Sequence, residues 1–521
     1  MHKRLETELP DKFDWQNLLT SLRDSFILTT RRKPKQLVEF LDTFDWRFFK
    51  ASLCLTRIGN KYTLSDIYTE KIISEFIWRR KKEYRSACDL ASDNLRKRFS
   101  QIQGPRAAIK IAELNCSGSN VQILNEDRKT VALLAEETIS LPQDDSGNEL
   151  PLKTILRLTP VKGYNAEFKK VRCTLEQLGL DRLAPAEPLI LTALNAIKIV
   201  PCKYSSKIRT PLKPEQTILE AAVMLSTDMV KVMCSNEQGI IEDIDIEFLH
   251  DYRVTIRRTR ALLTQLKGVF APAESDEFKQ RFSALGRMTN HMRDYDVLLS
   301  YRERYQKMLP PVLSHGLKPF FQSIVKQRRK EFIKISNYLD SDEYHTLMAD
   351  WSKFLKETTL EQKNSHSDDN VVAFVSKRIM KRFKRIVRIA GKIDEYTPYA
   401  DVHAVRIECK KLRYMLEFFA PLYEKNLSAP IARLKKLQTL LGDFNDLCVQ
   451  SDALSGKVKR LTPKGARAMH TAAALGGLIA LLSRDREEIR YKFKTAISDF
   501  ISEENQLYFT NIFAGRMESG T

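Results

Sequence analysis

The sequence lacks the features that would place it in several common protein classes. Its eight cysteines lie far apart and none form a C-x-x-C pair, so the sequence indicates neither a zinc site nor a disulfide framework. The opening residues, MHKRLETELP, contain no apolar core and predict no signal peptide. The longest apolar run, residues 472–482, is too short to cross a bilayer. We therefore expect a cytoplasmic protein without a membrane span.

Acidic residues are too few to balance the basic ones. The chain has 86 lysines and arginines against 66 aspartates and glutamates, which gives a formal net charge of +20. This surplus predicts a polyanionic partner, either nucleic acid, anionic lipid or polyphosphate. With 521 residues, 43% of them hydrophobic, the chain is long enough for about two to four domains with full cores.

One stretch, HDYRVTIRRTR at residues 250–260, places its positive charge on a single face of a predicted helix. At about 100° per residue, side chains at offsets of 0, +3, +7 and +10 share one stripe, and here they are His250, Arg253, Arg257 and Arg260. Apolar side chains form a separate stripe on the same helix. Like charges at this spacing repel one another and weaken a helix, so the stripe predicts an anionic ligand.

The same pattern occurs again 153 positions later, in HAVRIECKKLR at residues 403–413. The equivalent side chains are His403, Arg406, Lys410 and Arg413. An additional cation at offset +8 is present in both copies, as Arg258 and Lys411. Two copies with matching charged and apolar faces indicate an internal duplication.

Both stretches resemble the signature helices of the CHAD domain, the conserved-histidine α-helical domain. In that family a Leu-Gly element and an Arg-Asp-x-Asp or Asn-Asp element follow each basic helix. The first half has Leu285-Gly286 and then Arg293-Asp294-Tyr295-Asp296, and the second half has Leu441-Gly442-Asp443-Phe444-Asn445-Asp446. The resemblance implies an all-helical domain over residues 212–515, with repeats at about 212–357 and 371–515, that binds inorganic polyphosphate.

The first 205 residues have a different pattern. Stretches typical of β-strands recur at residues 51–56, 107–114, 121–124, 131–134 and 155–159, with helical patterns at 15–25 and 165–178. Residues 41–57 and 156–171 resemble segments of the CYTH fold, the triphosphate tunnel family. The polar, proline-containing stretch 203–215 marks a boundary. We expect a multidomain chain, with an α+β antiparallel tunnel-like domain at residues 1–205 before the all-α domain.

The CYTH resemblance implies a metal site in the first strand, where that family has Glu-x-Glu-x-Lys. Here Glu6 and Glu8 keep the carboxylate spacing, but Pro10 replaces the lysine. If this domain were active, it would be a metal-dependent triphosphatase using Mg²⁺ or Mn²⁺ on these two carboxylates. We otherwise expect a scaffold or weak binding module with no cofactor, metal or catalytic residue.

Further cations belong to the predicted polyphosphate surface. Residues 377–388, KRIMKRFKRIVR, contain seven lysines or arginines and no acid. The full predicted set is His250, Arg253, Arg257, Arg258, Arg260, Arg329, Arg378, Arg382, Arg385, His403, Arg406, Lys410, Lys411 and Arg413. An exposed, solvated face is the ordinary interpretation of a single basic helix, and each histidine could instead bond to a neighbouring acid. We expect Asp294, Asp296, Asn445 and Asp446 to brace the arginines, because carboxylates repel phosphate.

These observations predict non-enzymatic binding of inorganic polyphosphate, with attachment to polyphosphate granules as a further hypothesis. Histidine adds a donor whose charge depends on pH, so binding should tighten toward acid pH. Nucleic acid is less favoured, because aromatic residues are not interleaved with the cations and no duplex-binding motif is visible. The sequence does not indicate an oligomeric state.

Overall fold

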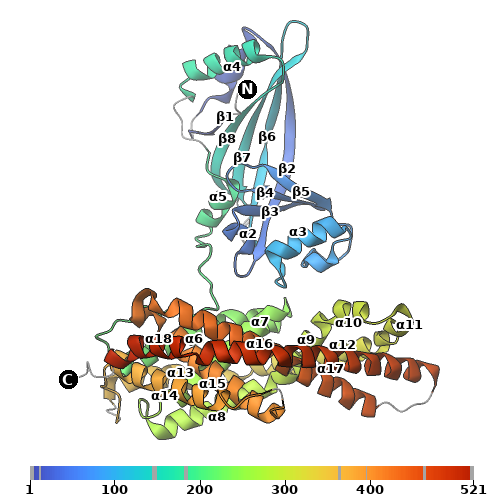
Figure 1. Cartoon of the computed structure of the whole chain (residues 1–521). Coiled ribbons are helices and arrows are strands. Elements are labelled where there is room, and N and C mark those ends of the chain that lie inside the picture. Colours follow the sequence, from blue (N-terminus) through green and yellow to red (C-terminus); the bar gives the residue numbers. More distant parts are fainter. Residues whose placement is uncertain are drawn as a thin grey trace. The chain divides into compact units, whose positions relative to one another are not determined.

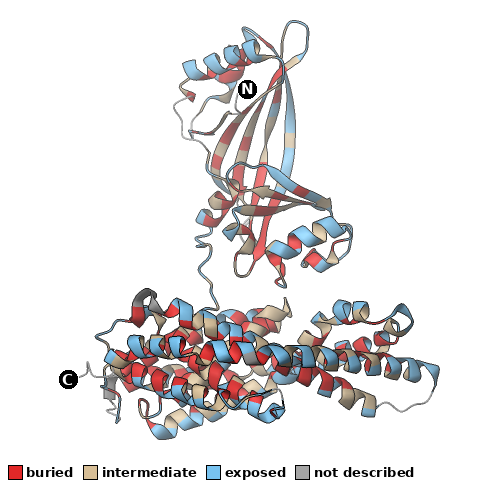
Figure 2. Ribbon diagram, viewed as in Figure 1, coloured by how far each residue is buried: buried red, intermediate tan, exposed pale blue. Residues whose placement is uncertain are grey.

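The chain folds into two compact units, Met1–Ser205 and Ser206–Thr521, in the computed structural model (Figure 1). The structure describes residues 5–10, 13–142, 149–180, 186–361, 365–394, 396–460 and 465–516. The predicted fold class is confirmed, since an antiparallel sheet domain precedes an all-helical one. In each unit the buried residues line the inward faces of strands and helices (Figure 2).

The first unit is built on one eight-stranded antiparallel sheet with the order β1-β8-β7-β6-β2-β3-β4-β5. Its strands are β1 (Leu5–Leu9), β2 (Ile27–Thr43), β3 (Leu53–Ile58), β4 (Lys61–Asp66), β5 (Ile72–Ile77), β6 (Ala108–Leu124), β7 (Thr130–Leu141) and β8 (Leu150–Pro160). Its helices are α1 (Trp15–Arg23), α2 (Arg47–Lys50), α3 (Asp93–Gln103), α4 (Asn165–Gln177) and α5 (Leu189–Ala196). One apolar core cluster joins α1 and α4 to β6, β7 and β8.

The sheet corrects one prediction. The stretches 107–114 and 121–124 were expected as separate strands, but β6 runs through both. The polar residues between them resemble a turn in the sequence, yet they pair with β7 along their whole length. A side chain at Gly118 would collide with the backbone of Glu136, so glycine here permits a close approach of two strands.

The second unit consists of helices. They are α6 (Ile218–Ile241), α7 (Ile246–Gln265), α8 (Pro272–Met288), α9 (Asn290–Ser300), α10 (Arg302–Met308), α11 (Pro311–Ser314), α12 (Leu317–Leu339), α13 (Asp342–Glu361), α14 (Val371–Ala390), α15 (Tyr399–Phe418), α16 (Ser428–Lys459), α17 (Ala466–Ile501) and α18 (Glu503–Phe513). Equivalent packings occur in the two halves: α6 packs on α13 as α14 packs on α18, and α7 packs on α8 as α15 packs on α16. The halves meet where α6 packs on α14, where α7 packs on α15, and where α17 packs on α10, α11 and α12.

The halves differ in one helix. The sequence pattern of residues 281–300 favours a single helix, but the chain breaks at Thr289 into α8 and α9. The equivalent α16 continues unbroken through its Leu441-Gly442 element. The longer spacing between Leu285-Gly286 and Arg293 therefore accommodates a helix break that the second half does not have.

Helix α17 is long and apolar enough to cross a membrane. A core helix of a globular protein can have the same length and composition. Ala474, Leu475, Leu478 and Leu482 of α17 lie in an apolar cluster with residues of α9, α10, α12 and α16. Within the described residues there is no clear membrane span.

Candidate anion-binding site

The two basic helices present their apolar stripes to the core, as their spacing predicts. Asp245 begins α7 by accepting hydrogen bonds from the backbone N–H groups of Glu247 and Phe248. Tyr252 and Ile256 of α7 are buried, and so are Val405 and Cys409 of α15. Burial of these stripes fixes the rotation of each helix and leaves the cationic stripes away from the core.

Arg257 joins the cationic stripes of the two halves. Its charge lowers the pKa of Arg253 on its own helix and of Arg406 and Lys410 on α15, in each case after burial as the larger cause. These four residues are referred to below as the inter-repeat cluster. Arg257 is exposed and forms no hydrogen bond or ion pair within the described part of the chain. Residues 153 positions apart thus contribute cations to one surface.

Lys410 is the most crowded member of the inter-repeat cluster. Burial first, and then the charges of Arg406, Arg257 and Arg413, lower the pKa of its ammonium group to about 8, while Asp446 acts in the opposite direction. The ammonium group has no hydrogen bond or ion pair to any residue that the structure describes. Such an environment gains most from a bound anion, which would neutralise several cations together.

The acids near the cluster are fewer than the cations. The Asp446 carboxylate lies 3.9 Å from the Arg406 guanidinium, and Glu417 lies 3.6 Å from Arg258 and 3.5 Å from Arg413. Arg258 also donates to the backbone carbonyl of Ser206 at 2.7 Å. The buried Nε atoms of five arginines have no hydrogen-bond partner among the described atoms: Arg253, Arg258, Arg260, Arg406 and Arg413.

Asn445 and Asp296 brace basic side chains. His403 Nδ1 lies 3.0 Å from Asn445 Oδ1, which also accepts a hydrogen bond from the Tyr399 hydroxyl at 3.0 Å. With the amide oxygen as acceptor, Nδ1 of His403 carries the proton and Nε2 is left for another partner. Asp296 accepts a hydrogen bond from Arg328 at 2.5 Å. His250, the equivalent of His403 on α7, is partly buried.

Arg253 supports the break between α8 and α9. Its Nη1 donates to the carbonyl oxygen of Gly286 at 3.0 Å and to the Thr289 hydroxyl, and its Nη2 donates to Asn290 Oδ1 at 2.7 Å. Carbonyls at the end of a helix lack partners within the helix, and Arg253 supplies one. The predicted binding residue therefore also has a structural role.

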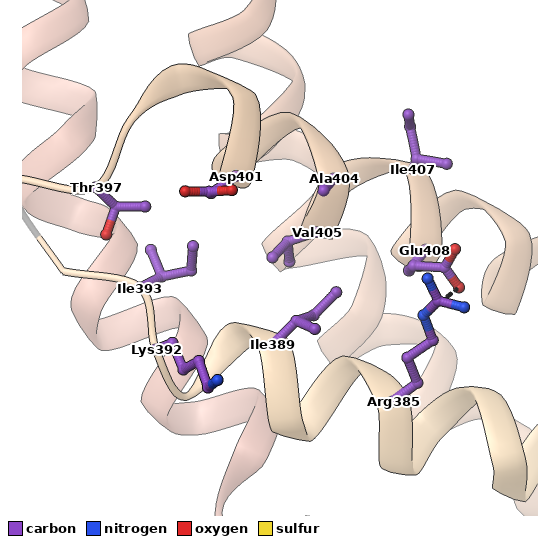
Figure 3. Close-up of a pocket in the computed structure, with 10 residues that line it drawn as sticks. All are labelled: Arg385, Ile389, Lys392, Ile393, Thr397, Asp401, Ala404, Val405, Ile407 and Glu408. Carbon is purple, nitrogen blue, oxygen red and sulfur yellow. Dashed lines mark ion pairs between the residues drawn. The ribbon is translucent and has the colours of Figure 1, made fainter.

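A second group of predicted binding residues lies around one acid. The buried carboxylate of Glu408 accepts from Arg382 at 2.6 Å and from Lys411 at 2.9 Å, and Arg385 lies 3.9 Å away. Figure 3 shows Arg385 and Glu408 at one end of a pocket of about 450 Å³ between α14 and α15. Asp401 also lines this pocket (Figure 3). Arg382 and Lys411 are thus paired with a buried acid, whereas Arg257 and Lys410 of the inter-repeat cluster form no ion pair with a described residue.

Two further predicted residues have other positions. Arg378 donates to the carbonyl oxygens of Gln265 at 2.8 Å and Lys267 at 2.9 Å, and so satisfies carbonyls at and just beyond the end of α7. Arg329, on α12, stacks over Phe332 of the same helix at 4.6 Å. The structure thus brings together part of the predicted set and gives the remaining residues separate surroundings.

Residues 227–455 match the family model of the CHAD domain. This segment of the chain is a CHAD domain. The chain is also similar to the crystal structure of the CHAD domain from the plant Ricinus communis, at 25% identity and a TM-score of 0.47, over 56% of this chain and 96% of that one. PptA from Streptomyces chartreusis is similar at 15% identity and a TM-score of 0.42, over 54% and 99% of the two chains. A search of the curated proteins found no match.

Outside the CHAD domain, the carboxylates predicted for a metal are engaged by cations. Glu6 accepts from Arg157 at 2.9 Å, and Glu8 lies 3.7 Å from Lys153. Arg157 also lies 3.2 Å from Glu137 and 3.6 Å from Glu70. The described residues include no group of three His, Cys, Asp or Glu side chains arranged to hold a metal ion. Glu6 and Glu8 thus lie in ion pairs with cations of β8.

Proposed function

We propose that the CHAD domain binds inorganic polyphosphate at the inter-repeat cluster without cleaving it. The observation that supports this proposal is the junction of Arg257 with Arg406 and Lys410, where cations from both halves meet with too little acid to balance them. The CHAD resemblance, which implies polyphosphate as the ligand, agrees with this chemistry.

Polyphosphate suits this surface for a physical reason. It carries about one negative charge per phosphate unit and has no bases to be read, so its recognition requires only neutralisation and hydrogen-bond donors. Arginine supplies bidentate donors to phosphate oxygens, and lysine supplies a point charge. Release of counterions adds a favourable term that falls with rising salt, as it does for other polyanions.

The direct test compares two double variants of the full chain. Arg257→Ala with Lys410→Ala removes two cations from the inter-repeat cluster. Lys169→Ala with Lys170→Ala removes two exposed cations from α4 in the first unit and serves as the charge-matched control. Calorimetric titration with long-chain polyphosphate should show about 10- to 100-fold weaker binding for the first variant and less than about twofold for the control.

Two results would count against the proposal. Equal losses in both variants would mean that net charge, rather than this cluster, determines binding. Displacement of polyphosphate by an equal charge concentration of single-stranded nucleic acid, at fixed salt, would mean that the surface does not distinguish the two polyanions. A salt series on the parent chain should also show affinity falling as salt rises.

A cytoplasmic location at polyphosphate granules follows from this proposal. A protein that holds long polyphosphate without consuming it can accumulate wherever the polymer is concentrated. Microscopy of the fluorescently tagged chain should show co-localisation with stained granules, and the Arg257→Ala, Lys410→Ala variant should be diffuse.

A further inference from the structure

The C-terminal end of α16 carries cations that the inter-repeat cluster does not include. Lys457 donates to the side-chain oxygen of Gln327, on α12, at 3.2 Å. Arg460 is exposed and follows Lys457 by one helical turn. Neither residue forms an ion pair with an acid among the described residues. The contact brings this end of α16 against α12, 130 positions earlier in the chain.

The helix dipole does not account for the electrostatic surroundings of Lys457 at this helix end. A helix C-terminus favours positive charge and would raise the pKa of a lysine there. The pKa of Lys457 is instead lowered, first by burial and then by the charge of Arg460. Lys457 shares this crowding with Lys410 in the inter-repeat cluster. Glu331 and Arg460 both act on the pKa of Tyr295, and Glu331 is paired with Lys334 at 2.8 Å.

One face of α16 connects the two groups of cations. Asp446, which lies beside Arg406, precedes Lys457 by eleven residues, a rise of about 17 Å along the helix. Eleven residues also turn the helix by about 20° beyond three full circles, so the two side chains share a face. The exposed side chains between them on this face are the uncharged Val449 and Ala453, whereas Gln450 is buried and accepts a hydrogen bond from the Tyr305 hydroxyl at 2.5 Å. Asp452 points about 120° away from it.

We propose that Lys457 and Arg460 form a second contact for the same polyanion, so that a long phosphate chain runs from the inter-repeat cluster along α16. This rests on the proposed function and adds chain-length selection to it. A long chain spans both contacts and a tripolyphosphate reaches one. The domain therefore binds long polyphosphate more tightly than tripolyphosphate, beyond the statistical advantage of a longer chain.

The experiment measures both ligands on full-chain variants. Lys457→Ala with Arg460→Ala should weaken long-chain polyphosphate binding about three- to tenfold and leave tripolyphosphate affinity within about twofold. The control is Lys459→Ala with Lys384→Ala, which also removes two exposed cations, one of them on the opposite face of α16. All substituted residues are partly or fully exposed, and circular dichroism checks that each variant folds.

The outcomes separate this inference from the proposed function. If the Lys457, Arg460 variant loses no more long-chain affinity than the control, the second contact does not exist. If it loses affinity for both ligands equally, the end of α16 is not a separate contact and the inference is also wrong. The Arg257, Lys410 variant should lose both ligands, and retention of both there would overturn the proposed function itself.

Discussion

Nη1 of Arg253 donates to the carbonyl oxygen of Gly286 at 3.0 Å, at the point where α8 gives way to α9. Its counterpart in the second half, Arg406, has no helix break to support and lies 3.9 Å from Asp446. The two equivalent arginines, Arg253 and Arg406, therefore have different structural roles. One arginine holds backbone as well as presenting charge, while the other contributes chiefly charge.

This difference predicts unequal effects of the same substitution. Arg253→Ala should lower the free energy of unfolding of the CHAD domain by about 1–3 kcal/mol, because the Gly286 carbonyl and two side chains lose their donor. Arg406→Ala should cost less than about 1 kcal/mol, since its acid partner is exposed and its removal relieves repulsion with Lys410. Urea unfolding followed by helical circular dichroism measures both. Equal losses of unfolding free energy in the two variants would contradict a special structural role for Arg253.

Because Arg382 pairs with the buried carboxylate of Glu408, we expect it to stabilise the fold without contributing to polyphosphate binding. Arg382→Ala should destabilise the domain by about 1–3 kcal/mol, because Glu408 loses its 2.6 Å partner. Long-chain polyphosphate affinity should stay within about twofold of the parent. Lys384→Ala, an exposed cation on the same helix, is the control for charge. A large loss of polyphosphate affinity in Arg382→Ala would place Arg382 in the binding surface instead.

The same carboxylate has a defined pH dependence. Burial raises the pKa of Glu408, but Lys411, Arg382 and Arg385 lower it overall. A carboxylate with a lowered pKa in the folded state contributes stability above its unfolded pKa and loses it as the pH falls through the folded value. The stability difference between parent and Arg382→Ala should therefore shrink on acidification below the ordinary glutamate range. A difference that stays constant would mean that packing, rather than charge, causes it.

Helical periodicity was sufficient to predict the duplicated stripes, because these depend on local spacing, while the β-type stretches and the CHAD and CYTH resemblances predicted the fold class. It could not predict which cations are neutralised, because that depends on acids brought in by packing. Glu408 and Lys411 are three residues apart, so their pairing was open to prediction, but the approach of Arg382 from α14 was not. The break at Thr289 was also hidden, since no proline lies there and the nearby Gly286 has an equivalent, Gly442, at which α16 continues unbroken.

Arg157 gives a prediction for the first unit. Its guanidinium lies within 3.6 Å of Glu6, Glu70 and Glu137, and Glu137 also pairs with Lys33. Arg157→Ala should destabilise this unit by about 1–3 kcal/mol, because partly buried carboxylates lose their counter-charge. It should also make the unit's melting temperature rise on adding Mg²⁺ or Mn²⁺, since three carboxylates would then face the vacated position.

The matched control is Arg172→Ala, which breaks a surface pair with Glu176 at 2.9 Å on α4. It should change stability by less than about 1 kcal/mol and confer no response to divalent cations. A gain of thermal stability from Mg²⁺ in the parent chain would mean that these carboxylates bind the metal despite Arg157.

The lowered pKa of Lys410 predicts the pH range in which polyphosphate affinity should change. Its pKa in the free protein is lowered to about 8, by burial and by three neighbouring cations. A bound phosphate favours the charged ammonium, so binding raises this pKa and takes up part of a proton near pH 8. Affinity should therefore be nearly constant between pH 6.5 and about 7.5 if Lys410 alone titrates, and should weaken as the pH rises through about 8. Calorimetry in buffers of different ionisation enthalpy measures the proton uptake directly.

The Lys410→Met variant separates this effect from the rest of the surface. It should bind more weakly at pH 7 and show no further loss near pH 8. It should also be more stable than the parent at neutral pH, by about 1–3 kcal/mol, because a charged group that the folded state disfavours is gone. For a lysine whose pKa is lowered on folding, that penalty is complete below about pH 8 and vanishes above the unfolded value near 10.5, so the two chains should converge in stability there. An affinity loss near pH 8 that persists in Lys410→Met would assign the titration to another group.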